Sequence, residues 1–368
     1  MDNKEIYVSG ASPQTYFMLR LITRNVDSIS LLTTEKKCAY YSKHGKKILV
    51  NDYDAYLSEL RKVALKNTLY VTSGKDIEAL IEFEPDFFKR KNVFPNDLYG
   101  LSYFTSKTKT YELCDALGLP IIKTWPLSSI MPEFTPPNKV IAKWNVENTK
   151  NTLSDFKTRV FTTTKELNTF KATVPTELHH KIIVQEYIES KNGSNISFLA
   201  LYEHGDCKAG LLAQQLEQYP QGITSFLKEY DGILAKELIN AAKKLVYKTK
   251  FNGFCEVEFK LDPTFKNFYV LEVNPRPCGW SSALLGKYSN LEKLLIDPLA
   301  TPVISTNNLK WVNILRYLRG RLSVSFTSLL RGIVCVPFIN CYDIFHANDL
   351  KPFFSQFYRK KTHVIKKN

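Results

Sequence analysis

The 368-residue sequence contains no CxxC motif, no pattern typical of a secretory leader and no apolar run long enough to span a membrane. The seven cysteines include no CxxC pair, and an odd number argues against a full disulfide framework. The first residues are polar and lead directly into a short strand-like run, unlike a secretory signal. No apolar run approaches the roughly 20 residues that cross a bilayer. We therefore expect a cytoplasmic protein in a reducing compartment.

Glycine-rich nucleotide motifs are missing as well. The strand-like segment 5–10 ends at Gly10, but no GxGxxG fingerprint follows, so this turn does not indicate a dinucleotide site. The chain also has no internal repeat and no low-complexity tract. Its 44% hydrophobic and 13% aromatic content is that of a globular protein, and its length allows two or three domains.

Acidic residues are scarce near the end of the chain. Residues 301–368 hold eleven lysines and arginines but only two aspartates, a net charge of +9 within a total of +14. Aromatic residues are mixed among these basic residues, so the segment could meet an anionic membrane surface, nucleic acid or an acidic substrate. A solvated, basic helical cap on the rest of the protein is an equally good interpretation.

The periodicity of apolar residues predicts a mixed α+β and α/β chain. Alternating strands and helices in residues 1–95 predict a small α/β layer, and residues 301–368 predict a helical, basic extension. Residues 96–300 form the central domain of this division. Its expected strands cover 139–144, 159–163, 181–187, 196–202 and 208–215, and its expected helices cover 107–117, 165–171 and 235–248.

Residues 253–276 carry the strongest pattern. Alternating runs at 255–261 and 268–274 flank a turn near Phe265, which predicts an antiparallel hairpin. In that register Glu258 lies opposite Glu272, and Glu256 lies opposite Asn274. One face then carries these four polar residues, and the other carries Val257, Phe259, Leu271 and Val273.

Three acids on one sheet face repel one another, so their presence together favours a bound cation. Hard oxygen ligands with no nearby histidine or cysteine set suit Mg²⁺ or Mn²⁺. The alternative is a solvated outer face of a half-buried hairpin.

The hairpin follows an amphipathic helix and Gly253, and it ends in Glu272-Val-Asn-Pro-Arg276. With these features in this order, the chain resembles the ATP-grasp superfamily from about residue 95 to about residue 285. Within it, the chain is most similar to carboxylate-amine ligases related to carbamoyl-phosphate synthase and D-aspartate ligase. The resemblance implies an ATP-grasp fold after a Rossmann-like N-terminal domain, with ATP between two lobes and an acyl-phosphate intermediate.

The resemblance also implies a role for each matching residue. Glu258, Glu272 and Asn274 would hold the metals that bridge the ATP phosphates, and Glu256 would be a neighbour. Arg276 would face the γ-phosphate or the acyl phosphate, where a planar, permanently charged donor suits a developing charge.

Two lysines match the family's phosphate-binding positions, Lys107 before a helix and Lys143 in the strand Val-Ile-Ala-Lys. Together with Arg276, Lys143 would be catalytic. Taken alone, a lysine in such a place is usually a surface charge. The nucleotide-binding hinge would comprise Gln185, Glu186 and Ile188, with Gln185 and Ile188 acting through their main chains. Asn195, which follows the hinge, would also belong to the nucleotide site.

The sequence departs from the family pattern in three places. Residues 145–157 contain no glycine, although the family usually covers the phosphates here with a glycine-rich loop. Asn195 stands where an acid is common, and Gln214 and Gln215 stand where relatives tend to carry a basic residue. Side chains that could replace the loop glycines are Thr149, Asn151, Thr152, Ser154 and Lys157.

We therefore expect an ATP- and Mg²⁺-dependent ligase that joins a carboxylate to an amine and releases ADP and phosphate. The segment from Asp343 to Pro352 resembles the tails of ATP-grasp ligases in polysaccharide and cell-envelope pathways. It implies a sugar-nucleotide or lipid-linked glycan acceptor and a peripheral contact with the inner membrane surface. The alternatives are an ATP-grasp kinase, a non-catalytic nucleotide-binding regulator and, last, a nucleic-acid binder.

Overall fold

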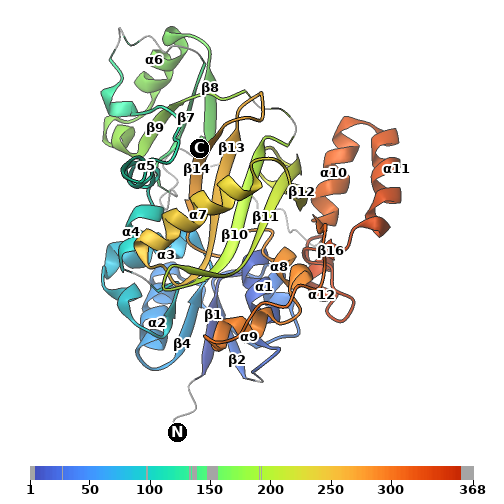
Figure 1. Ribbon diagram of the computed structural model, residues 1–368. Helices are drawn as coiled ribbons and strands as arrows, with labels where there is room; N and C mark the ends of the chain where they lie inside the picture. Colours follow the sequence, from blue (N-terminus) through green and yellow to red (C-terminus); the bar gives the residue numbers. More distant parts are fainter. Residues whose placement is uncertain are drawn as a thin grey trace, which may run out of the picture. The chain divides into compact units, whose positions relative to one another are not determined.

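The computed structural model describes residues 5–26, 28–96, 98–131, 134, 139–146, 156–189, 191 and 193–357 (Figure 1). Its residues fall into two compact units. The first unit combines residues 1–72, 219–225 and 279–368, and the second combines residues 73–218 and 226–278. The three-part division at residues 95 and 300 stays a prediction.

A parallel sheet layer begins the first unit. Its parallel strands lie in the order β3-β2-β1-β4. The chain adds β2 and β3 on one side of β1 and then adds β4 on the other side, as in a Rossmann-like domain. Gly10 makes the turn into the first helix with φ +110°, and a Cβ there would lie 2.7 Å from the Thr15 hydroxyl. The elements are β1 (Ile6–Ser9), α1 (Pro13–Ile22), β2 (Ile29–Thr33), β3 (Lys46–Leu49), α2 (Tyr53–Lys66) and β4 (Thr68–Val71).

The C-terminal part of the chain packs into this same unit. The buried Asp349 carboxylate accepts a hydrogen bond of 2.7 Å from the Ser42 hydroxyl, and Tyr16 donates to its carbonyl oxygen at 3.4 Å. Expected helices are present here, although two very short strands also form. The elements are α8 (Ser282–Lys287), α9 (Leu291–Ile296), β15 (Lys310–Val312), α10 (Ile314–Val324), α11 (Phe326–Cys335), β16 (Cys341–Tyr342) and α12 (Lys351–Phe354).

The second unit contains a small antiparallel sheet in the order β6-β9-β7-β8. Apolar side chains from these strands and from α6 form one buried cluster that includes Val140, Phe161, Leu167 and Val184. The capping box Thr163-x-x-Glu166 begins α6. The elements are β6 (Thr124–Pro126), β7 (Val140–Trp144), β8 (Thr158–Phe161), α6 (Thr164–Thr173) and β9 (Ile182–Glu186).

A larger sheet of the second unit contains the order β14-β13-β10-β11-β12. The helix α7 (Ala235–Thr249) buries Leu238, Ala242 and Leu245 and packs against β10 and β11. This burial confirms the amphipathic helix predicted before the hairpin. The strands are β10 (Asn195–Glu203), β11 (Asp206–Gln218), β12 (Thr224–Glu229), β13 (Gly253–Leu261) and β14 (Phe268–Asn274).

The hairpin of β13 and β14 has the predicted register. Glu258 pairs with Glu272, and Glu256 pairs with Asn274. The turn is held by the Asp262 carboxylate, which accepts hydrogen bonds from the backbone and side chain of Asn267 at 3.3 and 2.9 Å.

One detail of the predicted apolar face is wrong. A bulge shifts the register between Glu258 and Phe259, so Phe259 pairs with Val270 instead of Leu271. Val270 is fully buried, whereas Leu271 is half-buried as the extra residue. A perfect alternation of period two cannot reveal a bulge, because the pairing partner decides where the extra residue lies.

The second unit also contains four elements from residues 74–116. Helices α4 and α5 both pack against β14. The elements are α3 (Gly74–Phe83), β5 (Val93–Phe94), α4 (Leu98–Phe104) and α5 (Lys107–Ala116). No helix within the described ranges is both long enough and apolar enough to span a bilayer.

Candidate active site

The polar face of the hairpin is a hydrogen-bonded row. The side-chain amide of Asn274 donates to Glu256 at 3.1 Å and to Glu258 at 3.0 Å. Glu256 is buried, with 3% of its surface exposed, whereas Glu258 is half-buried. A single amide therefore bridges two carboxylates that would otherwise repel each other.

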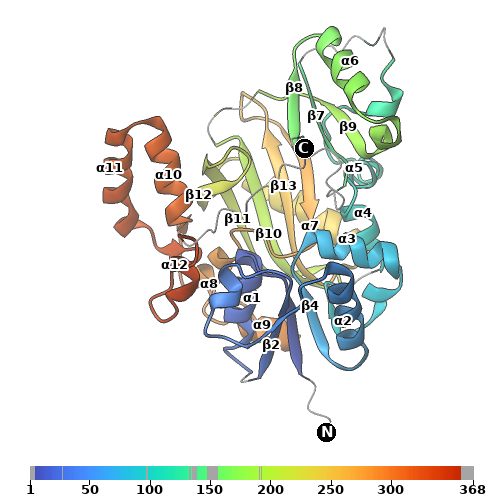
Figure 2. The same cartoon turned by 180° about the vertical axis from the view of Figure 1, so that it is seen from behind.

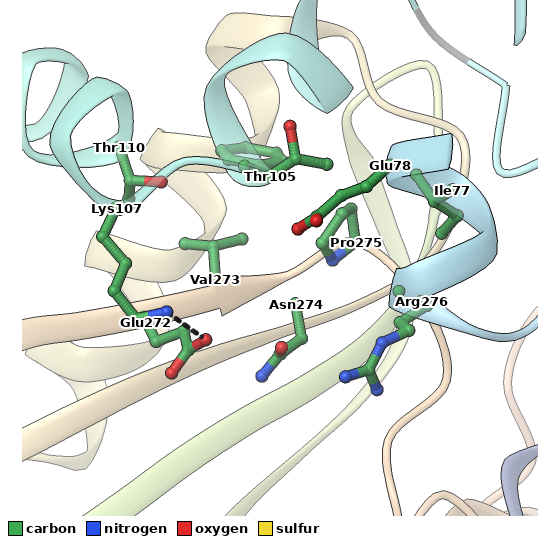
Figure 3. Close-up of a pocket in the computed structure, with 12 residues that line it drawn as sticks. Ile77, Glu78, Thr105, Lys107, Thr110, Glu272, Val273, Asn274, Pro275 and Arg276 are labelled. Carbon is green, nitrogen blue, oxygen red and sulfur yellow. Dashed lines mark hydrogen bonds and ion pairs between the residues drawn. The ribbon is translucent and has the colours of Figure 1, made fainter. Parts of the chain in front are cut away.

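Lys107 brings a positive charge to the same row from α5. Its ammonium lies 2.8 Å from a Glu272 carboxylate oxygen, and Figure 3 shows this pair beside Asn274 and Arg276. The side chain of Asn145 fixes the start of α5, because its carbonyl oxygen accepts from the Thr108 backbone at 2.9 Å. The lysine is therefore anchored where its charge meets the acids.

A pocket of the second unit is lined by Lys107, Glu272, Asn274 and Arg276. The sequence Asn274-Pro-Arg276 leaves the end of β14, and Pro275 stops the ladder because it has no backbone donor. Glu78 reaches toward the pocket from α3 (Figure 3). Arg276 is half-buried, and its guanidinium donates to the carbonyl of Pro277 at 3.2 Å.

The two central carboxylates differ in their electrostatics. Burial raises the pKa of Glu258 well above its ordinary value, and the charges of Glu256 and Glu272 raise it further. Burial also acts to raise the pKa of Glu272, but the ammonium groups of Lys107 and Lys143 outweigh it and lower that pKa. The pair therefore holds one readily ionised carboxylate and one that favours its proton.

Lys143 lies in a buried network on the small sheet. Its ammonium donates to the Tyr111 hydroxyl at 3.3 Å, and Gln185 donates to the same oxygen at 3.1 Å. Gln185 also donates to the Thr124 hydroxyl at 2.8 Å. Burial, together with the charge of Lys107, lowers the pKa of Lys143 to about 7. A phosphate group would restore the charge of such a lysine.

Comparison with known proteins identifies the fold. The structure is similar to the ADP complex of an N5-carboxyaminoimidazole ribonucleotide synthetase, with a TM-score of 0.64, 16% identity, and coverage of 91% of this chain and 86% of that one. It is also similar to the biotin carboxylase of Campylobacter jejuni, with a TM-score of 0.60, 15% identity and coverage of 80% and 70%. This chain has the ATP-grasp fold.

Two further comparisons agree with this fold. Residues 230–287 match the family model described as the carbamoyl-phosphate synthase L chain, ATP binding domain. The L-amino acid ligase of Bacillus licheniformis has a TM-score of 0.57 and 13% identity, covering 82% of this chain and 75% of that one. A search of curated proteins found no match. The matched residues contain α7 and the whole hairpin, so they include the ATP-grasp residues predicted to hold the metal.

The residues predicted to hold the metal have suitable chemistry. Glu258, Glu272 and Asn274 present two carboxylates and one amide, which are oxygen donors of the kind that Mg²⁺ and Mn²⁺ prefer. In the structure, the Lys107 ammonium donates a hydrogen bond to Glu272 and the Asn274 amide nitrogen donates one to Glu258, so both carboxylates have a partner. Rotating the Asn274 amide would present its oxygen instead. Within the described part of the chain, no three His, Cys, Asp or Glu side chains form a cluster that could hold a metal ion.

The predicted hinge lies at the end of β9. Gln185 sits between two paired strands, opposite Ile141 of β7 and Thr124 of β6, so its main chain belongs to the sheet ladder. Its side chain reaches Tyr111 instead. The Glu186 backbone donates to the Lys123 carbonyl at 2.9 Å. Ile188 lies two residues beyond the strand and is half-buried, so its main-chain contact with an adenine ring stays a prediction.

Asn195 occupies a different setting from Lys107 and Lys143. Its side-chain oxygen accepts from the Lys260 ammonium at 2.9 Å, and Ser194 accepts from the same lysine at 3.0 Å. Burial lowers the pKa of Lys260 to about 8. Asn195 therefore holds a buried lysine two residues from Glu258 on the same face of β13.

The two glutamines that replace basic residues brace this end of the sheet. Gln214 donates to the carbonyl of Gly193 at 2.9 Å, and Gln215 donates to the Ser197 hydroxyl at 2.9 Å. Of the predicted replacements for the loop glycines, Lys157 is exposed just before β8. The others, Thr149, Asn151, Thr152 and Ser154, lie outside the described residues.

Sequence reasoning missed Tyr111 and Lys260. Tyr111 had no signal beyond its place in the α5 pattern, because its partners come from distant strands. Lys260 had one: it follows Glu256 and Glu258 at a spacing of two, so it shares their face of β13.

Proposed function

We propose that this protein is an ATP- and Mg²⁺-dependent ligase that joins a carboxylate to an amine. The observation that supports this most is the meeting of Lys107 and Glu272 at 2.8 Å, beside Glu258, Asn274 and Arg276. These are the residues that an ATP-grasp site requires for phosphates and metal, and they come from α5, β13 and β14.

In the proposed reaction an oxygen of the substrate carboxylate attacks the γ-phosphorus of ATP. The bond from that phosphorus to the bridging oxygen breaks, which releases ADP and forms an acyl phosphate. The amine nitrogen then attacks the acyl carbon, the carbon–oxygen bond breaks, phosphate leaves, and the nitrogen loses a proton to solvent. The products are an amide, ADP and phosphate.

The protein contributes mainly position and charge. Lys107 and Lys143 would hold phosphate oxygens, and Arg276 would face the charge that develops during transfer. The metal, held by Glu258, Glu272 and Asn274, would neutralise the phosphate charge when bound.

A screen of acids and amines that measures ADP release tests the proposal. We expect ADP release only when ATP, one acid and one amine are present together. Glu272→Gln should lower this rate about 100-fold or more, because it removes one metal carboxylate and the partner of Lys107. Glu82→Gln, an exposed residue of α3, is the matched control and should keep the wild-type rate.

Three results would contradict the ligase proposal. ADP release that needs the acid but never an amine, with a stable phosphorylated product, would indicate a kinase. Melting shifts with ATP but no ADP from any pair would indicate a regulatory nucleotide-binding protein. A rate that Glu272→Gln leaves unchanged would place the metal elsewhere.

A narrower proposal concerns the acceptor, which would be a sugar nucleotide or a lipid-linked glycan. It is supported by the net charge of +9 in residues 301–368, which could lie near acceptor phosphates or at the inner membrane surface. Activity with phosphorylated sugar amines but not with the parent amines would support this acceptor class. Residues 358–368 of the basic end lie outside the described part of the chain.

A further inference from the structure

Two helices of the first unit, α10 and α11, form a hairpin whose outer surface is largely exposed. Ser325 ends α10 and also caps α11, accepting a hydrogen bond from the Ser328 backbone at 3.0 Å. The helices touch closely at Gly332, where a Cβ would lie 3.2 Å from the Arg321 side chain and 3.4 Å from the Tyr317 ring. In both views the pair stands apart from α1, α8 and α9 of its own unit (Figures 1 and 2).

The apolar stripe of α11 faces solvent. Phe326, Leu330, Ile333 and Val334 follow the spacing i, i+4, i+7, i+8, which places them on one helix face. Such a stripe normally packs on a core, yet Phe326 is 66% exposed and Val334 is 65% exposed. Phe338, 78% exposed, extends the apolar surface beyond the helix. Isolated exposed apolar residues are common, but an aligned set marks an interaction surface.

The segment that forms this hairpin carries charge of a single sign. No acidic residue occurs from residue 298 to residue 342, whereas Lys310, Arg316, Arg319, Arg321 and Arg331 all fall in this range. Arg319 and Arg331 are exposed on the two helices. A partner for this surface therefore has to be apolar and negatively charged at once.

We propose that the α10–α11 hairpin docks on an anionic lipid bilayer, with the stripe of α11 among the acyl chains and the arginines at the headgroups. An amphipathic helix with basic residues beside a large apolar face lies in the plane of such an interface. At 10 residues, α11 is about 15 Å long, so it would rest on the surface. A second copy of the chain is a poorer partner, because its hairpin would bring the same positive charge.

This inference goes beyond the proposed ligase activity and does not depend on it. It narrows the sequence-based expectation, which allowed membrane contact for the whole basic segment 301–368, to the hairpin within that segment. The aligned stripe of the hairpin supplies apolar area for this contact, because a basic segment alone would give only a weak, salt-sensitive attraction.

Co-sedimentation of the full chain with lipid vesicles tests the inference. We expect binding to phosphatidylcholine vesicles that contain phosphatidylglycerol, and little binding to phosphatidylcholine alone. Val334→Glu should weaken this binding about tenfold or more, because it places a charge in the stripe. Phe83→Glu is the matched control, since Phe83 is an equally exposed residue of α3 at 65%, and it should bind as the wild type does.

A truncation separates the hairpin from the chain end. Removing residues 358–368 should weaken binding less than Val334→Glu does. The inference is overturned if no vesicle binds, if both vesicle types bind equally, or if Val334→Glu keeps full binding while the truncation abolishes it. It is also overturned if Val334→Glu converts a dimer to a monomer in light scattering without changing vesicle binding. An unchanged melting temperature shows that each variant is folded.

Discussion

Lys143 is buried, and burial disfavours the positive charge of its ammonium group. It is 9% exposed, and burial together with Lys107 lowers its pKa to about 7. The free protein therefore carries this charge only partly near neutral pH. Binding of a phosphate group favours the protonated form, so nucleotide binding and proton uptake are linked.

This linkage predicts a pH dependence of ATP affinity. Above pH 7 the free protein has lost the Lys143 proton, so ATP binding must recover it, and the Kd should rise by up to about tenfold per pH unit. Calorimetry between roughly pH 6.5 and roughly pH 8.5 measures the effect. Lys143→Gln should bind more weakly at low pH and should lose this rise of the Kd with pH, and the wild-type slope in that variant would contradict the assignment.

Single residues also explain which site predictions were possible. The positions of Glu258 and Glu272 followed from the alternation of two short runs, and the observed register confirms them. The contact between Asn195 and Lys260 had no counterpart in the resemblance, because it depends on the pairing of β10 with β13. Cross-strand partners are set by the sheet order, which local patterns do not encode.

At the scale of elements, Tyr111 joins α5 to both sheets of the second unit. Its hydroxyl donates to the carbonyl of Leu271, the bulge residue of β14, at 2.8 Å. The same oxygen accepts from Lys143 and Gln185 of the small sheet. One buried hydroxyl therefore supports the bulge and orients a proposed catalytic lysine.

Tyr111→Phe should therefore lower the free energy of unfolding by about 1–3 kcal/mol, because it leaves buried donors and a carbonyl without their partner. Chemical denaturation measures this change. Tyr103→Phe on α4 is the control and should change the free energy of unfolding by less than about 0.5 kcal/mol. Equal stability of the Tyr111 variant and the wild type would show that water replaces the hydroxyl.

At the scale of the whole molecule, the two acids of the segment from Asp343 to Pro352 both have hydrogen-bond partners elsewhere in the chain. The buried Asp343 carboxylate accepts from Asn313 at 2.8 Å, and burial raises its pKa to about 6. Asp349 accepts from Ser42 at 2.7 Å, which joins the late part of the chain to the N-terminal layer of the same unit. These contacts give the segment a structural role beside the proposed role of its tail.

A double-mutant cycle on Asp349 and Ser42 tests this link. Asp349→Ala, Ser42→Ala and the double variant should give a coupling energy of about 1–3 kcal/mol, because both side chains are buried. The exposed pair of Lys139 and Glu189, also 2.8 Å apart, is the control and should couple by less than about 1 kcal/mol. Equal coupling in the two pairs would mean that burial does not strengthen the Asp349 link.

The sequence by itself determined the elements and the acid row of the hairpin, because the periods of helices and strands are local properties of the chain. It also predicted the ATP-grasp fold, which the comparisons confirm. Only the tertiary structure decided the bulge at Leu271, the network around Tyr111 and the exposure of the α11 stripe. Each of these depends on which distant segment packs nearby, and an amphipathic pattern does not state whether its apolar face meets a core or solvent.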